Sequence, residues 1–389
     1  MYKQIFLKRG KEESLERFHP WIFSGAIHHT DNGIEEGEVV RVVTENGDYI
    51  AVGHYQQGSI AVRVLTFNEV EIDDQFWESR LQSALDMRLS IGLANNPQTN
   101  AYRLVHGEGD LLPGLIIDVY GDTAVMQAHS IGMHLSRHAI AQALAKVMKN
   151  RVSNIYYKSE TTLSFVEPEN GFLLGETDNN IAVENGLKFY VDWLRGQKTG
   201  FFVDQRENRA LLEKYSADKN VLNMFCYTGG FSFYAMRGGA KSVHSVDSSA
   251  KAIELTRRNV ELNFPGDSRH EAFCEDAFKY LDKIQGYNLI ILDPPAFAKH
   301  RGALHNALKG YTRLNQKAFE KIEKGGILFT FSCSQVVTKE HFRNAVFTAA
   351  ALAKRKVRIL HQLHQPADHP INIYHPEGEY LKGLVLYVE

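Results

Sequence analysis

The side chain with the clearest chemical potential is Cys333, in the stretch TFSCSQ (330–335). A thiol between two hydroxyl side chains could serve packing, bind a metal or act as a nucleophile. A thiolate that adds to C6 of a pyrimidine makes C5 an enolate-like carbon, able to attack an electrophilic methyl group. Cys226 and Cys274 fall inside apolar, strand-like segments, where structural cysteines are expected. Cys333 is therefore the candidate nucleophile.

A second candidate is the segment DPPAF (293–297), which follows the apolar run LIIL. Pro294 and Pro295 prevent helix continuation and fix an extended turn, which makes the loop stiff. On such a loop, Asp293 could hydrogen-bond a cytosine ring and stabilise its adduct, while Phe297 stacks on the base. The plain alternative is a rigid connection from strand to helix.

A glycine pair follows another apolar strand in NMFCYTGGFS (223–232). Gly229 and Gly230 allow the backbone to turn tightly and to approach a ligand at a helix N-terminus. Asp247 ends the next strand, where a carboxylate can accept both hydroxyls of a ribose. The loop lacks full G-x-G-x-x-G spacing, which disfavours a dinucleotide and leaves S-adenosylmethionine as the fitting adenosine-containing cofactor. A simple turn is the alternative.

Asp276 and Ala277 follow a third strand. Asp276 could accept a hydrogen bond from an adenine amino group while apolar neighbours cover the ring. Aspartate is also favoured as a helix N-cap, so capping alone would explain this position.

These candidates share one structural context. From residue 220 onward, short apolar strands (VLNMFCY, SVHSVD, RHEAFC, YNLIILD and GILFTFS) alternate with helix-length segments such as SAKAIELTRRNVELN. Such alternation predicts an α/β fold with a mostly parallel, doubly wound sheet. Because ligands bind at the carboxyl ends of such strands, the candidate residues are expected to lie along one edge.

The preceding chain has a different pattern. Residues 39–67 read as short strands of a small β-rich module, and a helix is expected from Asp74 to about Gly92. Strands around a helical run near 132–149 then indicate an α+β arrangement. Asn185-Gly186 is a hairpin signal that opens the last unit. We predict three domains: 1–70, 71–178 and 179–389.

Composition excludes several classes of protein. With 44% hydrophobic and 23% charged residues among 389, the chain is neither disordered nor membrane-spanning, and its start has no secretory h-region, so a cytoplasmic location is expected. The three cysteines lack C-x-x-C spacing, and the loose group His361, His364, His369 and His375 lacks zinc spacing, so no metal is predicted. A net charge of −2 leaves RNA contact to a local patch.

Four motifs taken together resemble one family: QKTGFFVDQREN (197–208), FCYTGGFS (225–232), DPPAFAK (293–299) and SCS (332–334). They look like the ribosomal RNA large subunit methyltransferase I family, which makes 5-methylcytosine in 23S ribosomal RNA. HPWIFSGAI (19–27) is similar to that family's N-terminal PUA domain, and RLVHGEGDLLPGLIIDVYGD (103–122) to its central domain. ADHP and EYLKGL near the C-terminus also match.

The resemblance implies a C-terminal class I Rossmann-like methyltransferase domain behind a PUA domain and a central α+β domain. It implies Cys333 as nucleophile and a cofactor site for S-adenosyl-L-methionine. That site is lined by Asn223, Phe225, Tyr227, Thr228, Gly229, Gly230, Asp247, Asp276, Ala277 and Asp293. Arg206 is placed beside the cofactor, where it pairs with the methionine carboxylate or, equally, forms a structural ion pair with Asp204.

The expected partner is 23S ribosomal RNA or a large-subunit assembly particle, with no membrane, and whether the chain forms a homodimer is left open. Lys8 and Arg9 beside the PUA-like module are the candidate RNA contacts, joined at the target base by Pro294, Pro295 and Phe297. Two rival functions remain. One is a methyltransferase of the same fold acting on guanine or an exocyclic amine, and the other is a catalytically idle RNA-binding factor.

Overall fold

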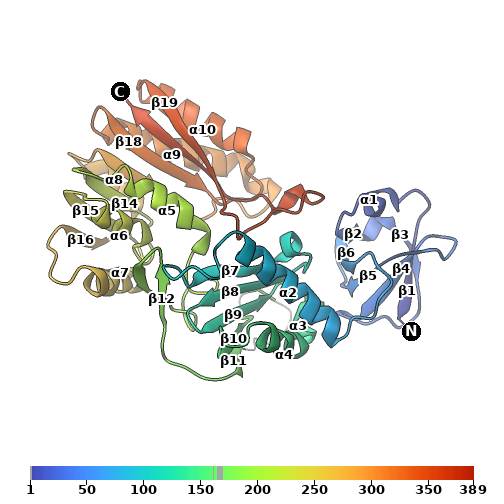
Figure 1. The fold of residues 1–389 in the computed structure, drawn as a ribbon. Helices are drawn as coiled ribbons and strands as arrows, with labels where there is room; N and C mark the ends of the chain where they lie inside the picture. Colours follow the sequence, from blue (N-terminus) through green and yellow to red (C-terminus); the bar gives the residue numbers. More distant parts are fainter. Residues whose placement is uncertain (1, 161, 164–169) are drawn as a thin grey trace. The chain divides into compact units, whose positions relative to one another are not determined.

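The computed structural model describes residues 2–160, 162–163 and 170–389. The chain forms two compact units, shown as a ribbon in Figure 1. The first comprises Met1–Gly186, Val191–Val203 and Ala367–Gly378, and the second comprises Leu187–Tyr190, Asp204–Pro366 and Glu379–Glu389. The finer division into three domains stays a prediction.

The first unit begins with a six-stranded sheet in the order β2-β6-β5-β4-β1-β3. Its elements are β1 (Lys3–Leu7), α1 (Glu13–Glu16), β2 (Trp21–Phe23), β3 (Ile27–Thr30), β4 (Val39–Val43), β5 (Tyr49–Tyr55) and β6 (Ile60–Thr66). Alternate residues of β1 and β4, such as Ile5, Leu7, Val40 and Val42, are fully buried in one core. That alternation is the period-two pattern of a half-buried sheet, and it confirms the strands expected in 39–67.

A second sheet in this unit has the order β11-β10-β9-β8-β7. Its elements are α2 (Asp74–Ser90), β7 (Ala101–His106), β8 (Leu115–Tyr120), β9 (Thr123–Ala128), α3 (Ile131–Leu135), α4 (Arg137–Val147), β10 (Asn154–Lys158) and β11 (Asn170–Leu174). The helical run expected near 132–149 is present as two helices, α3 and α4, which meet at Ser136.

A two-residue turn lies where the chain first leaves the first unit. Asn185 (φ 48°) and Gly186 (φ 81°) both adopt left-handed backbone conformations, as a type I′ turn requires. They join β12 (Ile181–Glu184) to β13 (Leu187–Tyr190), which confirms the predicted turn.

The second unit is built on a seven-stranded sheet in the order β16-β15-β14-β17-β18-β20-β19. Its elements are α5 (Arg206–Glu213), β14 (Asn220–Met224), α6 (Gly230–Arg237), β15 (Ser242–Asp247), α7 (Ala250–Asn263), β16 (His270–Cys274), α8 (Ala277–Lys283), β17 (Leu289–Leu292), α9 (Leu304–Lys321), β18 (Gly326–Ser332), α10 (Lys339–Leu352), β19 (Val357–His364) and β20 (Lys382–Val388). Strands β14 to β18 pair in parallel, whereas β20 is antiparallel to both β18 and β19. The predicted doubly wound α/β fold is confirmed.

Both faces of this sheet are covered, as Figure 1 shows. Leu328 on β18 packs with side chains of α8, α9 and α10 in one core. Phe331, whose side chain points the other way, lies 5.6 Å from the ring of Phe231 on α6. A sheet buried on both sides explains why its central strands are continuous apolar runs rather than alternating ones.

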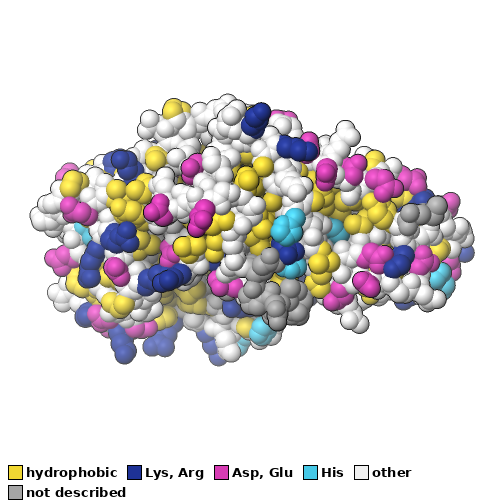
Figure 2. All heavy atoms as spheres, turned by 90° about the horizontal axis from the view of Figure 1, so that it is seen from below, with side chains coloured by type: hydrophobic (Ala, Val, Ile, Leu, Met, Phe, Trp, Pro, Cys, Tyr) yellow, Lys and Arg dark blue, Asp and Glu magenta, His cyan; other side chains and the backbone are white. Residues whose placement is uncertain are grey.

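No helix in the described ranges is long and apolar enough to cross a membrane. On the face shown in Figure 2, Lys and Arg side chains lie interspersed with Asp and Glu side chains. This mixture agrees with the near balance of 44 basic and 46 acidic residues.

Candidate active site

The carboxyl ends of β14 to β18 place the predicted residues along one edge of the second unit's sheet. Leu292 at the end of β17 pairs with Thr330 on β18 and with Met224 on β14. Parallel pairing therefore brings together the segments that follow these strands: 225–230, 293–298 and 333–337. Strand β15 adds Asp247 and β16 adds the segment that begins at Glu275.

The glycine loop after β14 has an unusual backbone. Phe225 (φ 58°) and Tyr227 (φ 46°) are left-handed, and Gly229 (φ 85°) is the N-cap of α6. A Cβ on Gly229 would lie 2.6 Å from Phe233 and 2.8 Å from Thr256. Glycine is therefore required here twice, for its positive φ and for close packing. The result is a tight strand-to-helix turn that leads into the N-terminus of α6, a backbone arrangement that suits an anionic or polar ligand.

Asn223, at the base of this loop, lies in a buried polar chain. Its Nδ2 donates to Ser232 Oγ at 2.9 Å, Ser232 Oγ lies 2.7 Å from Ser245 Oγ, and Ser245 Oγ lies 2.8 Å from His270 Nε2. Within the described ranges Asn223 Oδ1 has no hydrogen-bond partner. Asn223 thus connects β14 to α6 and, through Ser232, to β15. Its Oδ1 can accept a hydrogen bond from a ligand.

Asp247 is half-buried and holds the glycine loop. Its Oδ2 accepts from the backbone N–H of Tyr227 at 3.0 Å, and its Oδ1 accepts from the N–H of Ser249 at 2.9 Å. Each carboxylate oxygen has further lone pairs, so the same group can also accept from ribose hydroxyls. The glycine turn at Gly229 and Gly230 together with this carboxylate fits an adenosine-containing cofactor.

Asp276 is an exposed helix cap. It is the N-cap of α8, and its Oδ1 accepts from the N–H of Lys279 at 3.0 Å. The capping alternative is therefore realised, while the adenine role of Asp276 and of the buried Ala277 stays a prediction.

Asp293 is linked to the start of α5. Gln205 Nε2 donates to Asp293 Oδ2 at 3.0 Å, and Asn208 Nδ2 donates to Gln205 Oε1 at 2.6 Å. Gln205 and Asn208 are each 3% exposed, so this arrangement is fixed by packing. It holds the carboxylate at the carboxyl end of β17.

The neighbouring Arg206 is also buried, and its Nε donates to Glu207 Oε1 at 3.2 Å. The hydroxyl of Tyr380 donates to Asp204 Oδ2 at 2.7 Å. Arg206 and Asp204 therefore each have a partner within the protein. The cofactor role of Arg206 stays a prediction.

The two serines that flank Cys333, Ser332 and Ser334, both make buried hydrogen bonds that fix the loop. Ser332 Oγ donates to the hydroxyl of Tyr311 at 2.9 Å, and that hydroxyl lies 3.2 Å from Ser334 Oγ. Ser334 Oγ also accepts from the N–H of Ala298 at 3.3 Å. The two serines therefore attach the loop after β18 to α9 and to the DPPAF loop.

Cys333 itself is half-buried between those anchors, and its Sγ lies 3.9 Å from the carbonyl oxygen of Pro294. The predicted meeting of the two strand ends is thus present in the structure. Pro294 is buried, whereas Pro295 is exposed. The ring centroids of Phe297 and Tyr311 lie 4.6 Å apart. The predicted stacking of Phe297 on a base would therefore use the part of its ring that Tyr311 does not cover.

Of the two cysteines expected inside strands, Cys274 lies in one and Cys226 does not. Cys226 lies in the loop after β14 rather than inside a strand, and its burial raises the pKa of its thiol. Cys274 ends β16 and is exposed. A buried neutral thiol is inert, so Cys226 keeps its structural assignment.

The C-terminal histidines do not form one group. His361 Nε2 lies 2.7 Å from the hydroxyl of Tyr215, and His369 Nδ1 lies 3.2 Å from Asp368 Oδ1. His375 packs edge-on against Trp21, with ring centroids 4.2 Å apart. With His19 and Glu377 its ligand atoms lie within 4.8 Å of one another, an arrangement the sequence spacing did not indicate. The absence of a metal stays a prediction.

Lys8 and Arg9 lie after β1 in the first unit and are exposed. Lys8 Nζ donates to the carbonyl oxygen of Gly25 at 3.0 Å, which leaves two of its ammonium hydrogens for other acceptors. Their role in RNA contact stays a prediction.

Three buried groups at the site were missed from the sequence. Gln205 contacts Asp293, Tyr311 fixes the serines beside Cys333, and Lys382 donates to Ser334 and Val337. The motifs QREN and EYLKGL did mark the vicinity of Gln205 and Lys382. Nothing in the local pattern marked Tyr311, which reaches the site from the middle of a long helix.

Comparison with known proteins agrees with this geometry. Residues 133–372 match an S-adenosylmethionine-dependent methyltransferase family, and residues 5–67 match a PUA-like domain. A methyltransferase solved in complex with SAH is similar over 99% of both chains, with a TM-score of 0.85 and 24% identity. A Streptococcus mutans SAM-dependent methyltransferase also covers 99% of both chains, with a TM-score of 0.84 and 24% identity.

The fold and the site therefore define an S-adenosylmethionine-dependent methyltransferase that carries a PUA-like domain. Two curated relatives are named ribosomal RNA large subunit methyltransferase I. The one from Tolumonas auensis is 42% identical over 99% of both chains, and that from Klebsiella pneumoniae strain 342 is 39% identical over 100% of this chain and 99% of its own. At this similarity and coverage, the chain belongs to the ribosomal RNA large subunit methyltransferase I family.

Proposed function

We propose that this protein transfers a methyl group to C5 of a cytosine in 23S ribosomal RNA through a covalent adduct between Cys333 and C6. The names of its relatives support large-subunit ribosomal RNA as the substrate class. The observation that carries the cytosine-5 reaction is the meeting of Cys333 with the DPPAF loop, where Sγ lies 3.9 Å from Pro294 O.

The chain's own residues perform most of the reaction. The Cys333 thiolate forms a bond to C6, and the electron pair of the C5–C6 double bond moves onto C5 and the ring carbonyl. Asp293, held by Gln205, hydrogen-bonds the cytosine ring and stabilises this adduct. S-adenosylmethionine, when bound, supplies the electrophilic methyl group that C5 takes up. Loss of the C5 proton to a base then re-forms the double bond and expels the Cys333 thiolate.

The cofactor is held by the backbone of 223–230 and by Asp247, with Asp276, Ala277 and Arg206 as further proposed contacts. A target base inside a helix cannot reach Cys333, so it must leave the stack, and in this proposal Pro295 and Phe297 contact it. In this proposal the segments 1–70 and 71–178 hold the RNA, and Lys8 and Arg9 contact phosphates.

A trapped adduct tests the proposal directly. RNA that contains 5-fluorocytidine at the target carries a C5 substituent that cannot leave as a proton, so the adduct with Cys333 persists after methylation. We expect a denaturation-resistant protein–RNA species whose digest places the nucleotide on the Cys333 peptide. The Cys274→Ala variant, which removes an exposed thiol, is the matched control and should still form it. Trapping by Cys333→Ala at the wild-type level would refute the proposal.

A further inference from the structure

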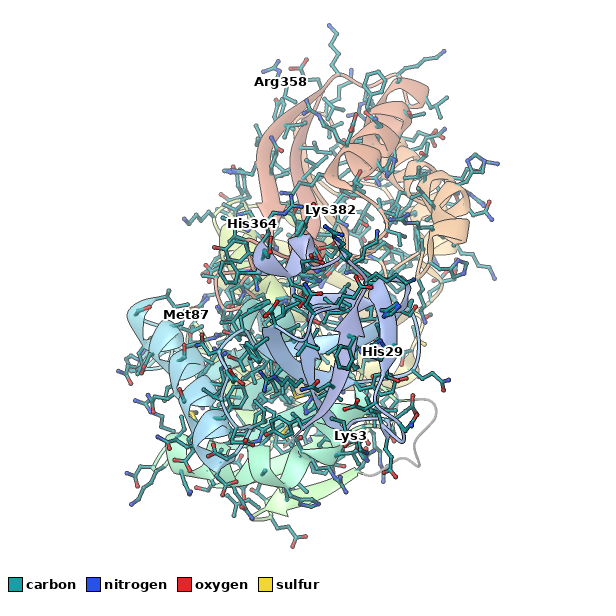
Figure 3. The ribbon with its side chains drawn as sticks, turned by 90° about the vertical axis from the view of Figure 1, so that its right-hand side faces the viewer. Lys3, His29, Met87, Arg358, His364 and Lys382 are labelled. Atoms are coloured by element: carbon teal, nitrogen blue, oxygen red, sulfur yellow. The ribbon has the colours of Figure 1, made fainter. Side chains whose placement is uncertain are left out.

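Lys382 is the first residue of β20 and lies beside the loop of Cys333. It pairs in register with Ser332 on β18 and with His364 on β19. Figure 3 shows Lys382 and His364 near each other, at the end of the two strands. Lys382 is 5% exposed, which is unusual for a lysine because burial of an ammonium group is costly unless it is paired.

The ammonium group has partners in the loop that follows β18. Lys382 Nζ donates to the carbonyl oxygens of Ser334 and Val337, each at 2.6 Å. Both acceptors lie within four residues of Cys333, and they bracket the turn that leads into α10. Two hydrogen bonds from a charged donor hold this backbone more firmly than neutral ones would.

The charge of Lys382 also acts on Cys333. Burial lowers the pKa of Lys382 to about 8, while negative charge on Cys333 and Glu379 opposes that shift and Lys339 adds to it. The interaction with Cys333 is mutual: a thiolate favours the ammonium form, so the ammonium favours the thiolate. The other titratable groups beside these two are His364 on β19, which pairs in register with Lys382, and Tyr311 on α9.

We propose that Lys382 is a positioning residue for Cys333, which fixes the 333–337 loop through two carbonyl groups and stabilises the thiolate that adds to the base. The inference rests on the proposed function, in which Cys333 is the nucleophile. The ammonium form predominates below a pH of about 8, so this support for the thiolate is present at neutral pH and is lost above that value.

The test needs neither RNA nor cofactor. The rate of Cys333 alkylation by iodoacetamide is measured by peptide mass spectrometry from pH 5 to 10, in the full chain. Because only the thiolate reacts, the midpoint of the profile reports the thiol pKa. For Lys382→Met we expect the midpoint to rise by about one unit, a roughly tenfold slower reaction at pH 7.

Two variants separate charge from packing. Lys382→Arg keeps the positive charge and should keep the midpoint within a few tenths of a unit of wild type. Lys339→Met removes an exposed lysine whose charge also acts on Lys382, and should leave the midpoint of Cys333 nearly unchanged. A purely structural role would change the alkylation rate by the same factor at every pH and would not move the midpoint.

Turnover completes the test. Lys382→Met should lower kcat at least tenfold at pH 7 with little change in the KM for S-adenosylmethionine, and Lys382→Arg should recover part of that loss. An unshifted midpoint with Lys382→Met would overturn the inference even if Cys333→Ala is inactive. Full 5-methylcytosine formation by Cys333→Ala would instead overturn the proposed function, and the alkylation result would still decide whether Lys382 sets the thiol pKa.

Discussion

Tyr311→Phe removes one oxygen atom, and with it the hydrogen bonds that attach Ser332 and Ser334, the serines beside Cys333, to α9. Tyr311 is fully buried on α9, and its hydroxyl joins Ser332 Oγ at 2.9 Å to Ser334 Oγ at 3.2 Å. Phenylalanine keeps the ring contact with Phe297 at 4.6 Å, so the packing is preserved. The loss is two buried hydrogen bonds.

The size of the effect follows from those two bonds. At about 1 kcal/mol for each buried hydrogen bond, Tyr311→Phe should lower the free energy of unfolding by about 2 kcal/mol. For a unit of this size, that corresponds to a fall in Tm of roughly 4–8 °C. Because the loop of Cys333 loses its attachment to α9, kcat should also fall, by about tenfold, while the KM for S-adenosylmethionine stays within twofold.

Thermal unfolding and methyl-transfer kinetics provide the assay. Tyr215→Phe is the matched control, because it removes a hydroxyl that lies 2.7 Å from His361 Nε2 in the same unit. The control should cost about 1 kcal/mol of stability and leave kcat unchanged. Equal kcat for Tyr311→Phe and wild type would refute the reasoning that the hydrogen bonds of Ser332 and Ser334 to Tyr311 position Cys333.

Further predictions concern the cofactor loop, the RNA contacts and pH. Gly229→Ala should abolish measurable S-adenosylhomocysteine binding in calorimetry, because its Cβ would lie 2.6 Å from Phe233 at φ 85°; binding at wild-type affinity would contradict the cofactor assignment. Asp247→Asn should weaken the same binding roughly tenfold, because its amide would oppose one of two backbone donors. Lys8→Gln with Arg9→Gln should reduce the salt dependence of RNA binding by about one to two units without changing Tm; an unchanged slope would exclude both as phosphate contacts. Burial lowers the pKa of His54 to about 4, from 6.5 in the unfolded chain. The stability that depends on the neutral imidazole is therefore complete above pH 6.5 and is lost as the pH falls from 6.5 to about 4. At pH 5 the loss is about 2 kcal/mol, so His54→Gln should flatten the fall in Tm between pH 7 and pH 5.

The sequence predicted the second unit's parallel sheet well, for a physical reason. Strands buried on both faces are apolar throughout, and β15 (Ser242–Asp247) and β18 (Gly326–Ser332) match the predicted segments residue for residue. The last two strands escaped prediction. β19 (Val357–His364) is a half-exposed edge with no continuous apolar run. β20 (Lys382–Val388) does contain an apolar run after its first residue, but that run follows β18 only after about fifty residues and was not assigned to the sheet.

For the candidate site, too, the sequence predicted the residues on strands and missed those on helices. Asp247, Asp293 and Cys333 directly follow or end strands, so parallel topology alone predicts that they share an edge. Gln205 and Tyr311 reach that edge from helices, and their side-chain directions depend on packing that no local pattern encodes. Their contacts with Asp293 and with the serines around Cys333 required the structure.

The most direct measurement is methyl transfer from labelled S-adenosylmethionine to 23S ribosomal RNA, followed by nucleoside analysis of the product. Wild type, Cys333→Ala and Cys274→Ala would be compared at equal concentration. We predict labelled 5-methylcytosine with wild type and Cys274→Ala, and none with Cys333→Ala. Equal labelling by all three proteins, or label on another base, would contradict a reaction through Cys333.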